Sequence, residues 1–149
     1  VQLRANVPLD IGIVYWACLA SPSTSFYIPF HFGISDFPTG FSSKSERPSS
    51  AFYDEKIART FHADPLQAFW TFSNFGNKVQ AASADTITLV KAQAWQIENN
   101  AFSLQRLLEE TACRLYLDDK TTAMQILANY SNGLYLSSME AIAKVLSNK

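Results

Sequence analysis

Residues 87–115 have the sequence ITLVKAQAWQIENNAFSLQRLLEETACRL, and this stretch decides the fold of the chain. Apolar side chains recur in it at spacings of three and four residues, and residues so spaced share one face of an α-helix. The pattern therefore predicts one long helix with a single apolar seam, which continues through the weak helix formers Asn99 and Asn100. The seam positions are Ile87, Val90, Ala94, Ile97, Ala101, Leu104, Leu108, Thr111 and Leu115.

Two further helices are predicted beside the long one. Asp64 and Pro65 are typical of a helix start, because Asp accepts hydrogen bonds from unpaired backbone N–H groups and Pro has no N–H to leave unpaired. This helix should end near Ala82, just before the long one begins. After a short connector at 118–120, apolar spacing predicts a last helix that continues through the Asn-Gly pair at 132–133. A short connector between two helices with apolar seams predicts an antiparallel helical hairpin.

The first part of the chain has the pattern of β-strands. Ile11–Leu19 is apolar at both alternating sets of positions, which indicates a strand covered on both sides. Ser25–Gly33 has Phe or Ile at every second position, and Pro29 within it indicates an edge strand or a bulge, because proline cannot donate a ladder hydrogen bond. Val1–Arg4 has the pattern of the end of an extended segment. The two strand segments, separated by turn residues, predict an antiparallel hairpin.

The predicted fold class is therefore α+β, with a short antiparallel sheet followed by a three-helix tail. The length of 149 residues favours a single domain, which divides into a strand-rich part at 1–63 and a helical part at 64–149. Because the chain begins at Val1 and not at Met, we expect it to be a piece of a longer protein, and its compartment, cytoplasmic or secreted, stays open.

Composition narrows the function classes. Apolar residues make up 48% of the chain and charged residues only 17%, so we expect some apolar surface to contact protein outside the chain, with an aromatic-rich core as the alternative. The net charge of −1 and the lack of a basic stripe argue against nucleic acid as a partner. No apolar run has the length of a membrane span.

The residues alone do not predict a complete catalytic site. Cys18 with His31 as its base would be a nucleophile pair, but a thiol in an apolar strand is more often structural. His62 with Asp64 supplies two metal ligands at best, and a zinc site needs three or four. The paired carboxylates at 109–110 and 118–119 are expected to be solvated or to favour helix ends. No metal or cofactor is therefore predicted.

Several segments together resemble the C-terminal part of cysteine dipeptidases of the dipeptidase A type, which are N-terminal-nucleophile hydrolases. The similarity is clearest from residue 1 to about residue 80, and the helical tail is similar in layout more than in motif. The matching segments are Val1-Gln-Leu-Arg4, Val14-Tyr-Trp-Ala17, Phe26-Tyr-Ile-Pro-Phe-His-Phe-Gly33, Asp36-Phe-Pro38 and Asp64-Pro-Leu-Gln-Ala-Phe-Trp-Thr-Phe72.

This resemblance implies part of an αββα sandwich and hydrolysis of short peptides through an acyl-enzyme. The nucleophile of the family is an N-terminal Cys whose own α-amino group is the base. Cys18 is internal, so the nucleophile would lie upstream, and this chain alone is expected to be inactive. Arg4 is the one candidate substrate-binding residue, since a guanidinium can hold a substrate carboxylate; a structural ion pair is the alternative.

The expected partners are the N-terminal part of the same protein and a short peptide substrate. Two other functions stay open at this point. One is a non-catalytic helical interaction module, with the hairpin as an oligomerisation surface and a homo-oligomer as the product. The other is an amidase that acts on a non-peptide amide, because a fold does not fix a substrate.

Overall fold

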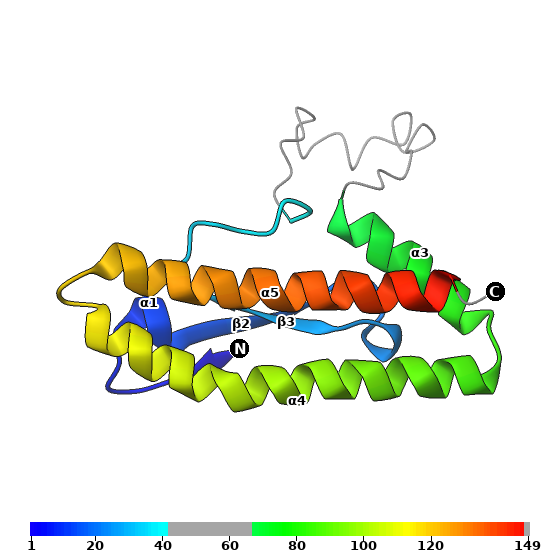
Figure 1. The fold of residues 1–149 in the computed structure, drawn as a ribbon, viewed down its shortest axis with the longest axis horizontal. Helices are drawn as coiled ribbons and strands as arrows, with labels where there is room; N and C mark the ends of the chain where they lie inside the picture. Colours follow the sequence, from blue (N-terminus) through cyan, green and yellow to red (C-terminus); the bar gives the residue numbers. More distant parts are fainter. Residues whose placement is uncertain (42–66, 148–149) are drawn as a thin grey trace.

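A computed structural model describes residues 1–41 and 67–147 of the chain (Figure 1). Over these residues the protein is α+β, with a three-stranded antiparallel sheet followed by three long helices, which confirms the predicted fold class. The elements in chain order are β1 (Gln2–Leu3), α1 (Leu9–Gly12), β2 (Ile13–Cys18), the 3-10 turn η1 (Pro22–Thr24), β3 (Tyr27–His31), α3 (Ala68–Gln80), α4 (Ala84–Leu115) and α5 (Lys120–Ser147).

The strand order is β1-β2-β3, so β2 lies in the middle of the sheet. Gln2 lies opposite Val14, and Val14 lies opposite His31. Because cross-strand partners point to the same side of a sheet, these three side chains share one face. The helix α4 covers this face, since its Gln105 donates a hydrogen bond to Gln2.

The strand β3 is an edge strand, as Pro29 predicts, and α5 covers its outer edge. The Ser131 hydroxyl of α5 donates a hydrogen bond of 2.6 Å to the carbonyl oxygen of Pro29. The proline therefore lies where no ladder donor is needed, while its own acceptor is satisfied by a helix.

The helices α4 and α5 form the predicted antiparallel hairpin and run side by side over most of their length (Figure 1). Ser83 caps α4 by accepting a hydrogen bond from the Thr86 backbone N–H. The Tyr130 hydroxyl ties the hairpin together by donating to the Ala101 carbonyl at 2.7 Å. Both helices are continuous, so the predictions that α4 passes through Asn99 and Asn100 and that α5 passes through residues 132–133 are confirmed.

The core joins the sheet to α3 through aromatic side chains. Phe26, which precedes β3, lies with its ring centroid 6.2 Å from that of Phe72 and 6.1 Å from that of Phe75. All three rings are almost fully buried. The predicted helix start at Asp64 and Pro65 lies outside the described residues, and α3 is described from Ala68 onward.

Two strand predictions were wrong in part. Ile11 and Gly12 lie in α1 and not in the strand, because their N–H groups both donate to the Pro8 carbonyl and close a helical turn. The strand itself is not covered on both sides, since the Tyr15 side chain is 59% exposed.

The seam of α4 also departs from its prediction in the second half of the helix. Leu104 is 49% exposed, whereas Gln105 is 2% exposed and Glu109 is 7% exposed. The buried face shifts by one position at Ala101, because polar partners on the sheet draw Gln105 and Glu109 inward in place of the leucine.

Replacing Phe72 with Ala should reduce the free energy of unfolding by about 3–5 kcal/mol, because it removes a fully buried ring and leaves a cavity against Phe26. Urea unfolding followed by circular dichroism measures the loss. The matched control is Phe69→Ala on the same helix, whose ring is 48% exposed and whose loss should be below about 1 kcal/mol. Equal losses in the two variants would contradict the packing of α3 described above.

Candidate functional site

A buried polar cluster joins the sheet to α4, and we define it as Gln2, Arg4, His31, Gln105 and Glu109. The carboxylate of Glu109 is its centre. Oε1 accepts a hydrogen bond from His31 Nε2 at 3.0 Å and another from Gln105 Nε2 at 2.8 Å. Oε2 forms an ion pair with the Arg4 guanidinium. The cluster therefore links β1, β3 and α4 through one acidic side chain.

Burial determines the protonation state of His31. Its side chain has no exposed surface. Burial, helped by the Arg4 guanidinium, lowers the pKa of His31 from 6.5 to about 4. Although Glu109 alone would favour an imidazolium, Arg4 already neutralises that carboxylate. His31 is therefore neutral near pH 7 and donates Nε2–H to Glu109.

The second nitrogen of His31, Nδ1, is buried and has no hydrogen-bond partner among the described residues. A neutral imidazole that is oriented by a carboxylate and keeps a lone pair on its other nitrogen has the form of a general base. This nitrogen lies beneath the sheet and has no exposed surface, so no substrate reaches it in this conformation. In this structure His31 connects β3 to α4 through its hydrogen bond to Glu109.

Arg4, the predicted substrate-binding residue, lies just after β1 and at the rim of the polar cluster. Besides the ion pair with Glu109, its Nη2 donates to Gln2 Oε1 at 3.3 Å. The Arg4 side chain keeps 35% of its surface exposed. One side of the guanidinium is therefore committed to the protein, while part of it still faces solvent. Binding of a substrate carboxylate by Arg4 stays a prediction.

The structure does not bring Cys18 to His31. Cys18 lies opposite Tyr27 and His31 lies opposite Val14, so four residues of strand, or about 13 Å, separate the two positions. Burial raises the pKa of the Cys18 thiol, whereas a nucleophile needs a lowered one. Burial also raises the pKa of Cys113, and both thiols are free and only partly buried. Neither cysteine has the surroundings of a catalytic thiol.

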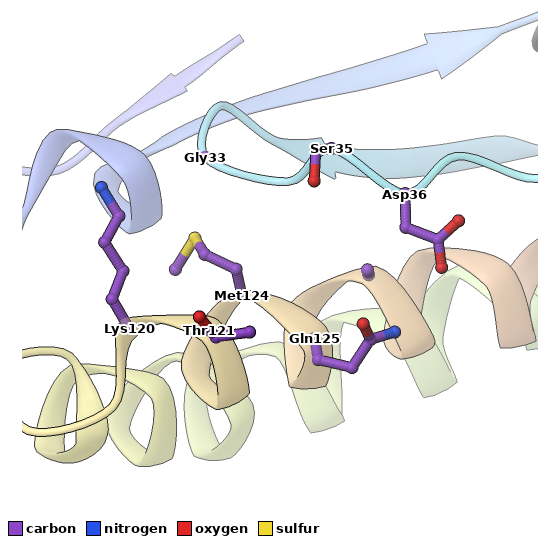
Figure 2. Close-up of a pocket in the computed structure, with 8 residues that line it drawn as sticks. Gly33, Ser35, Asp36, Lys120, Thr121, Met124 and Gln125 are labelled. Carbon is purple, nitrogen blue, oxygen red and sulfur yellow. The ribbon is translucent and has the colours of Figure 1, made fainter.

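A cavity of about 270 Å³ lies between the loop after β3 and the first turns of α5 (Figure 2). Figure 2 shows Lys120 and Asp36 at opposite ends of it. Lys120 Nζ lies 2.5 Å from Asp10 Oδ2, which also accepts a 2.5 Å hydrogen bond from the Tyr116 hydroxyl. The lining residues are Gly33, Ser35, Asp36, Lys120, Thr121, Met124, Gln125 and Ala128.

The Lys120 ammonium beside this cavity is already paired with the Asp10 carboxylate. The Lys120 ammonium lowers the pKa of Asp10, with help from the Tyr116 hydroxyl, and Asp10 in turn raises the pKa of Lys120. Among the described residues, neither a histidine nor a cysteine lines the cavity, so these residues offer no imidazole or thiolate to activate the hydroxyl groups of Ser35 and Thr121. The cavity is a pocket without a catalytic pair.

The paired carboxylates have different surroundings from those expected. Glu109 is buried in the polar cluster, so the prediction that both members of the pair at 109–110 are solvated was wrong for it. Glu110 is partly exposed and pairs with Arg106, and Asp119 caps α5 by accepting from the Thr122 N–H at 2.9 Å. Among the described residues, no three His, Cys, Asp or Glu side chains gather as metal ligands. His62 and Asp64 lie outside those residues.

The comparisons with known proteins add no identification. No protein-family model matches the chain, and no curated protein matches it. The dipeptidase resemblance therefore stays a prediction from the sequence. Within the described segments, no helix combines the length and the apolar character that a membrane crossing requires.

The free energy of unfolding should fall by about 2 kcal/mol between pH 7.5 and pH 5, because of His31 alone. The unfolded histidine takes up a proton near its ordinary pKa of 6.5, whereas the folded one resists protonation until about pH 4. Stability is therefore highest above pH 6.5 and is lost as the pH falls through that range. Urea unfolding at several pH values measures the slope. His31→Gln keeps a donor toward Glu109 and should lack this slope; an unchanged slope would contradict the assignment.

Proposed function

We propose that this chain is the C-terminal portion of a cysteine dipeptidase that hydrolyses short peptides through an acyl-enzyme. The observation that carries the proposal is the sheet face opposite α4, which is exposed at Leu3, Tyr15 and Phe32. Further along the same face, Ala17, Ile28 and Phe30 are buried, so the exposed part is confined to the end of the sheet near β1. The polar cluster and α4 occupy the covered side. A second β-layer on the opposite side would complete the αββα sandwich that the resemblance implies.

The open face consists of Leu3, Ile13, Tyr15 and Phe32. Leu3 lies opposite Ile13, and the Phe32 N–H donates to the Ile13 carbonyl at 2.9 Å, so these residues form an apolar row across β1, β2 and the first residue after β3. The exposed fractions are 76% for Leu3, 69% for Phe32 and 59% for Tyr15. Clustered apolar exposure of this kind is typical of a surface that contacts another protein layer.

The chemistry of the proposed enzyme divides between this chain and polypeptide upstream of it. The upstream part would supply the N-terminal Cys thiol and its α-amino base. This chain would supply Arg4, whose exposed part can donate to a substrate carboxylate while Glu109 fixes the other side of the guanidinium. The ion pair thus supports a positioned guanidinium, because a side chain held at one side loses less freedom on binding.

The experiment that tests the proposal is expression of the whole gene product with assay of dipeptide hydrolysis. We expect activity that depends on a cysteine exposed by processing upstream of Val1, and none from residues 1–149 alone. Absence of such a cysteine, or hydrolysis by this chain alone, would contradict the proposal. A panel of non-peptide amides distinguishes the amidase alternative, which has the same nucleophile.

In the active whole protein, Arg4→Lys should raise KM at least about tenfold for dipeptides that have a free C-terminal carboxylate, because Lys loses the fork of donors that Arg presents. Dipeptides with a blocked C-terminal amide should show no such change. Arg106→Lys is the control, since the Arg106 side chain is 89% exposed and pairs with Glu110 on its own helix. Steady-state kinetics measure the effect. A loss of stability with an unchanged KM would assign Arg4 a structural role only.

Phe32→Ser should reduce the free energy of unfolding of the whole protein by about 2–3 kcal/mol and that of this chain alone by less than about 0.5 kcal/mol. The difference arises because the open face is buried only when the second layer is present. Leu117→Ser, at the 92% exposed Leu117 in the connector before α5, should change neither protein. Equal small losses in both proteins would mean that nothing covers the open face.

The non-catalytic alternative, a helical oligomerisation module, is favoured by one observation. Leu104 and Leu107 lie three residues apart on α4 and are 49% and 61% exposed. Light scattering over a dilution series of the chain and of a Leu104→Gln, Leu107→Gln double variant separates the two functions. An oligomer that dissociates in the double variant supports the module, whereas a monomer at all concentrations contradicts it.

A further inference from the structure

The middle strand of the sheet is paired along only part of its length on one side. The residues of β2 from Val14 to Cys18 all have partners in β3, whereas β1 pairs only with Ile13 and Val14. We call the remaining side of Tyr15–Cys18 the free edge. Among the described residues, no strand pairs with it.

The hydrogen bonds at the start of β2 fix which backbone groups the free edge presents. Ile13 directs its carbonyl to β3, where Phe32 donates to it, and Gly12 directs its carbonyl to the other side, where the Arg4 N–H donates at 3.0 Å. Backbone groups of a strand alternate from side to side. The N–H and C=O groups of Trp16 and Cys18 therefore point away from β3, into the free edge.

We propose that the free edge binds a four-residue β-strand, formed by Val1 and the three residues of the polypeptide that lead into it, in the antiparallel register that β1 already has. This rests on the proposed function, in which more of the polypeptide precedes Val1. The register of Gln2 with Val14 places Val1 opposite Tyr15. The first residue before Val1 then lies opposite Trp16, and the third before Val1 lies opposite Cys18. Both pairs exchange N–H and C=O hydrogen bonds.

The side chains around the free edge set the chemistry of this strand. Its first and third residues share the face of Trp16, whose ring centroid lies 4.6 Å from that of Phe102 on α4. Phe102 is 51% exposed and Trp95 of the same helix is 71% exposed. Apolar, β-branched residues at the first and third positions would cover these rings. The second residue before Val1 lies opposite Ala17, on the same face as Tyr15.

The test extends the chain before Val1 by Thr-Val-Thr-Val and measures amide hydrogen exchange by NMR. We expect the Trp16 and Cys18 amide protons to exchange at least tenfold more slowly than in the chain extended by Gly-Ser-Gly-Ser. The Val14 amide, already paired with β1, serves as the internal control and should not change.

Two proline variants give the matched control. Proline at the first position before Val1 removes a donor that the register aims at Trp16, so the added protection should be lost. Proline at the second position has its missing N–H on the outer side of the strand, as Pro29 does in β3, so the protection should remain. Equal effects of the two prolines, or no protection from Thr-Val-Thr-Val, would overturn the proposal.

Two further outcomes keep this test separate from the proposed function. Concentration-dependent protection of the unextended chain would assign the free edge to a second copy and would also overturn the proposal. Protection by the extension, together with a whole gene product that does not hydrolyse dipeptides, would uphold the strand and reject the dipeptidase. Dipeptide hydrolysis by the whole gene product, without added protection of the Trp16 and Cys18 amides, would uphold the dipeptidase and reject the strand.

Discussion

The buried carboxylate of Glu109 is the constraint on which the rest of the structure depends. A carboxylate that loses its hydration costs several kcal/mol unless charged and polar partners replace the water. Glu109 has three such partners, and they come from different elements: Arg4 after β1, His31 at the end of β3, and Gln105 one turn earlier on α4. Removing one partner would leave part of a charge unsatisfied under the sheet. The cluster therefore fixes the position of α4 on the sheet more specifically than apolar contact could.

This constraint explains how a strand as short as β1 is held. Two paired residues are far below the length at which a strand is stable by its ladder alone. Gln2 and Arg4 flank the second of these residues, Leu3, and both reach into the polar cluster. The Arg4 N–H also donates to the Gly12 carbonyl, and a Cβ on Gly12 would lie only 2.9 Å from the Arg4 carbonyl oxygen. Side-chain anchoring and close backbone contact thus replace the missing length, and no other strand of the described residues pairs with the remainder of the β2 edge.

The sequence predicted those parts of the fold whose signals are local. Spacing of apolar residues gave the two long helices, and Pro29 correctly indicated an edge strand, because both signals depend on backbone geometry within one element. The polar cluster was missed because its residues are up to 107 positions apart and each is ordinary in its own segment. One signal was nevertheless present in α4. Counted from the buried Ala101, an ideal helical period of about 3.6 residues falls closer to Gln105 than to Leu104, so it favours Gln105 as the buried position. The second signal was the alternation of Gln2 and Arg4 in the first extended segment, which predicts that both polar side chains share one face.

The same cluster connects the architecture to the chemistry proposed for the chain. Arg4 is reached from β1, and the free edge of β2 is the place where β1 would be lengthened. A strand that continued β1 along Tyr15–Cys18 would add ladder hydrogen bonds just before Gln2 and Leu3, and Arg4 follows these two residues directly. The backbone at Arg4 would then be held from both directions, by the cluster on one side of the chain and by the ladder on the other. In this arrangement the added strand and the position of the Arg4 guanidinium depend on the same register, in which Gln2 lies opposite Val14. Completing the sheet would therefore also position the proposed substrate-binding group.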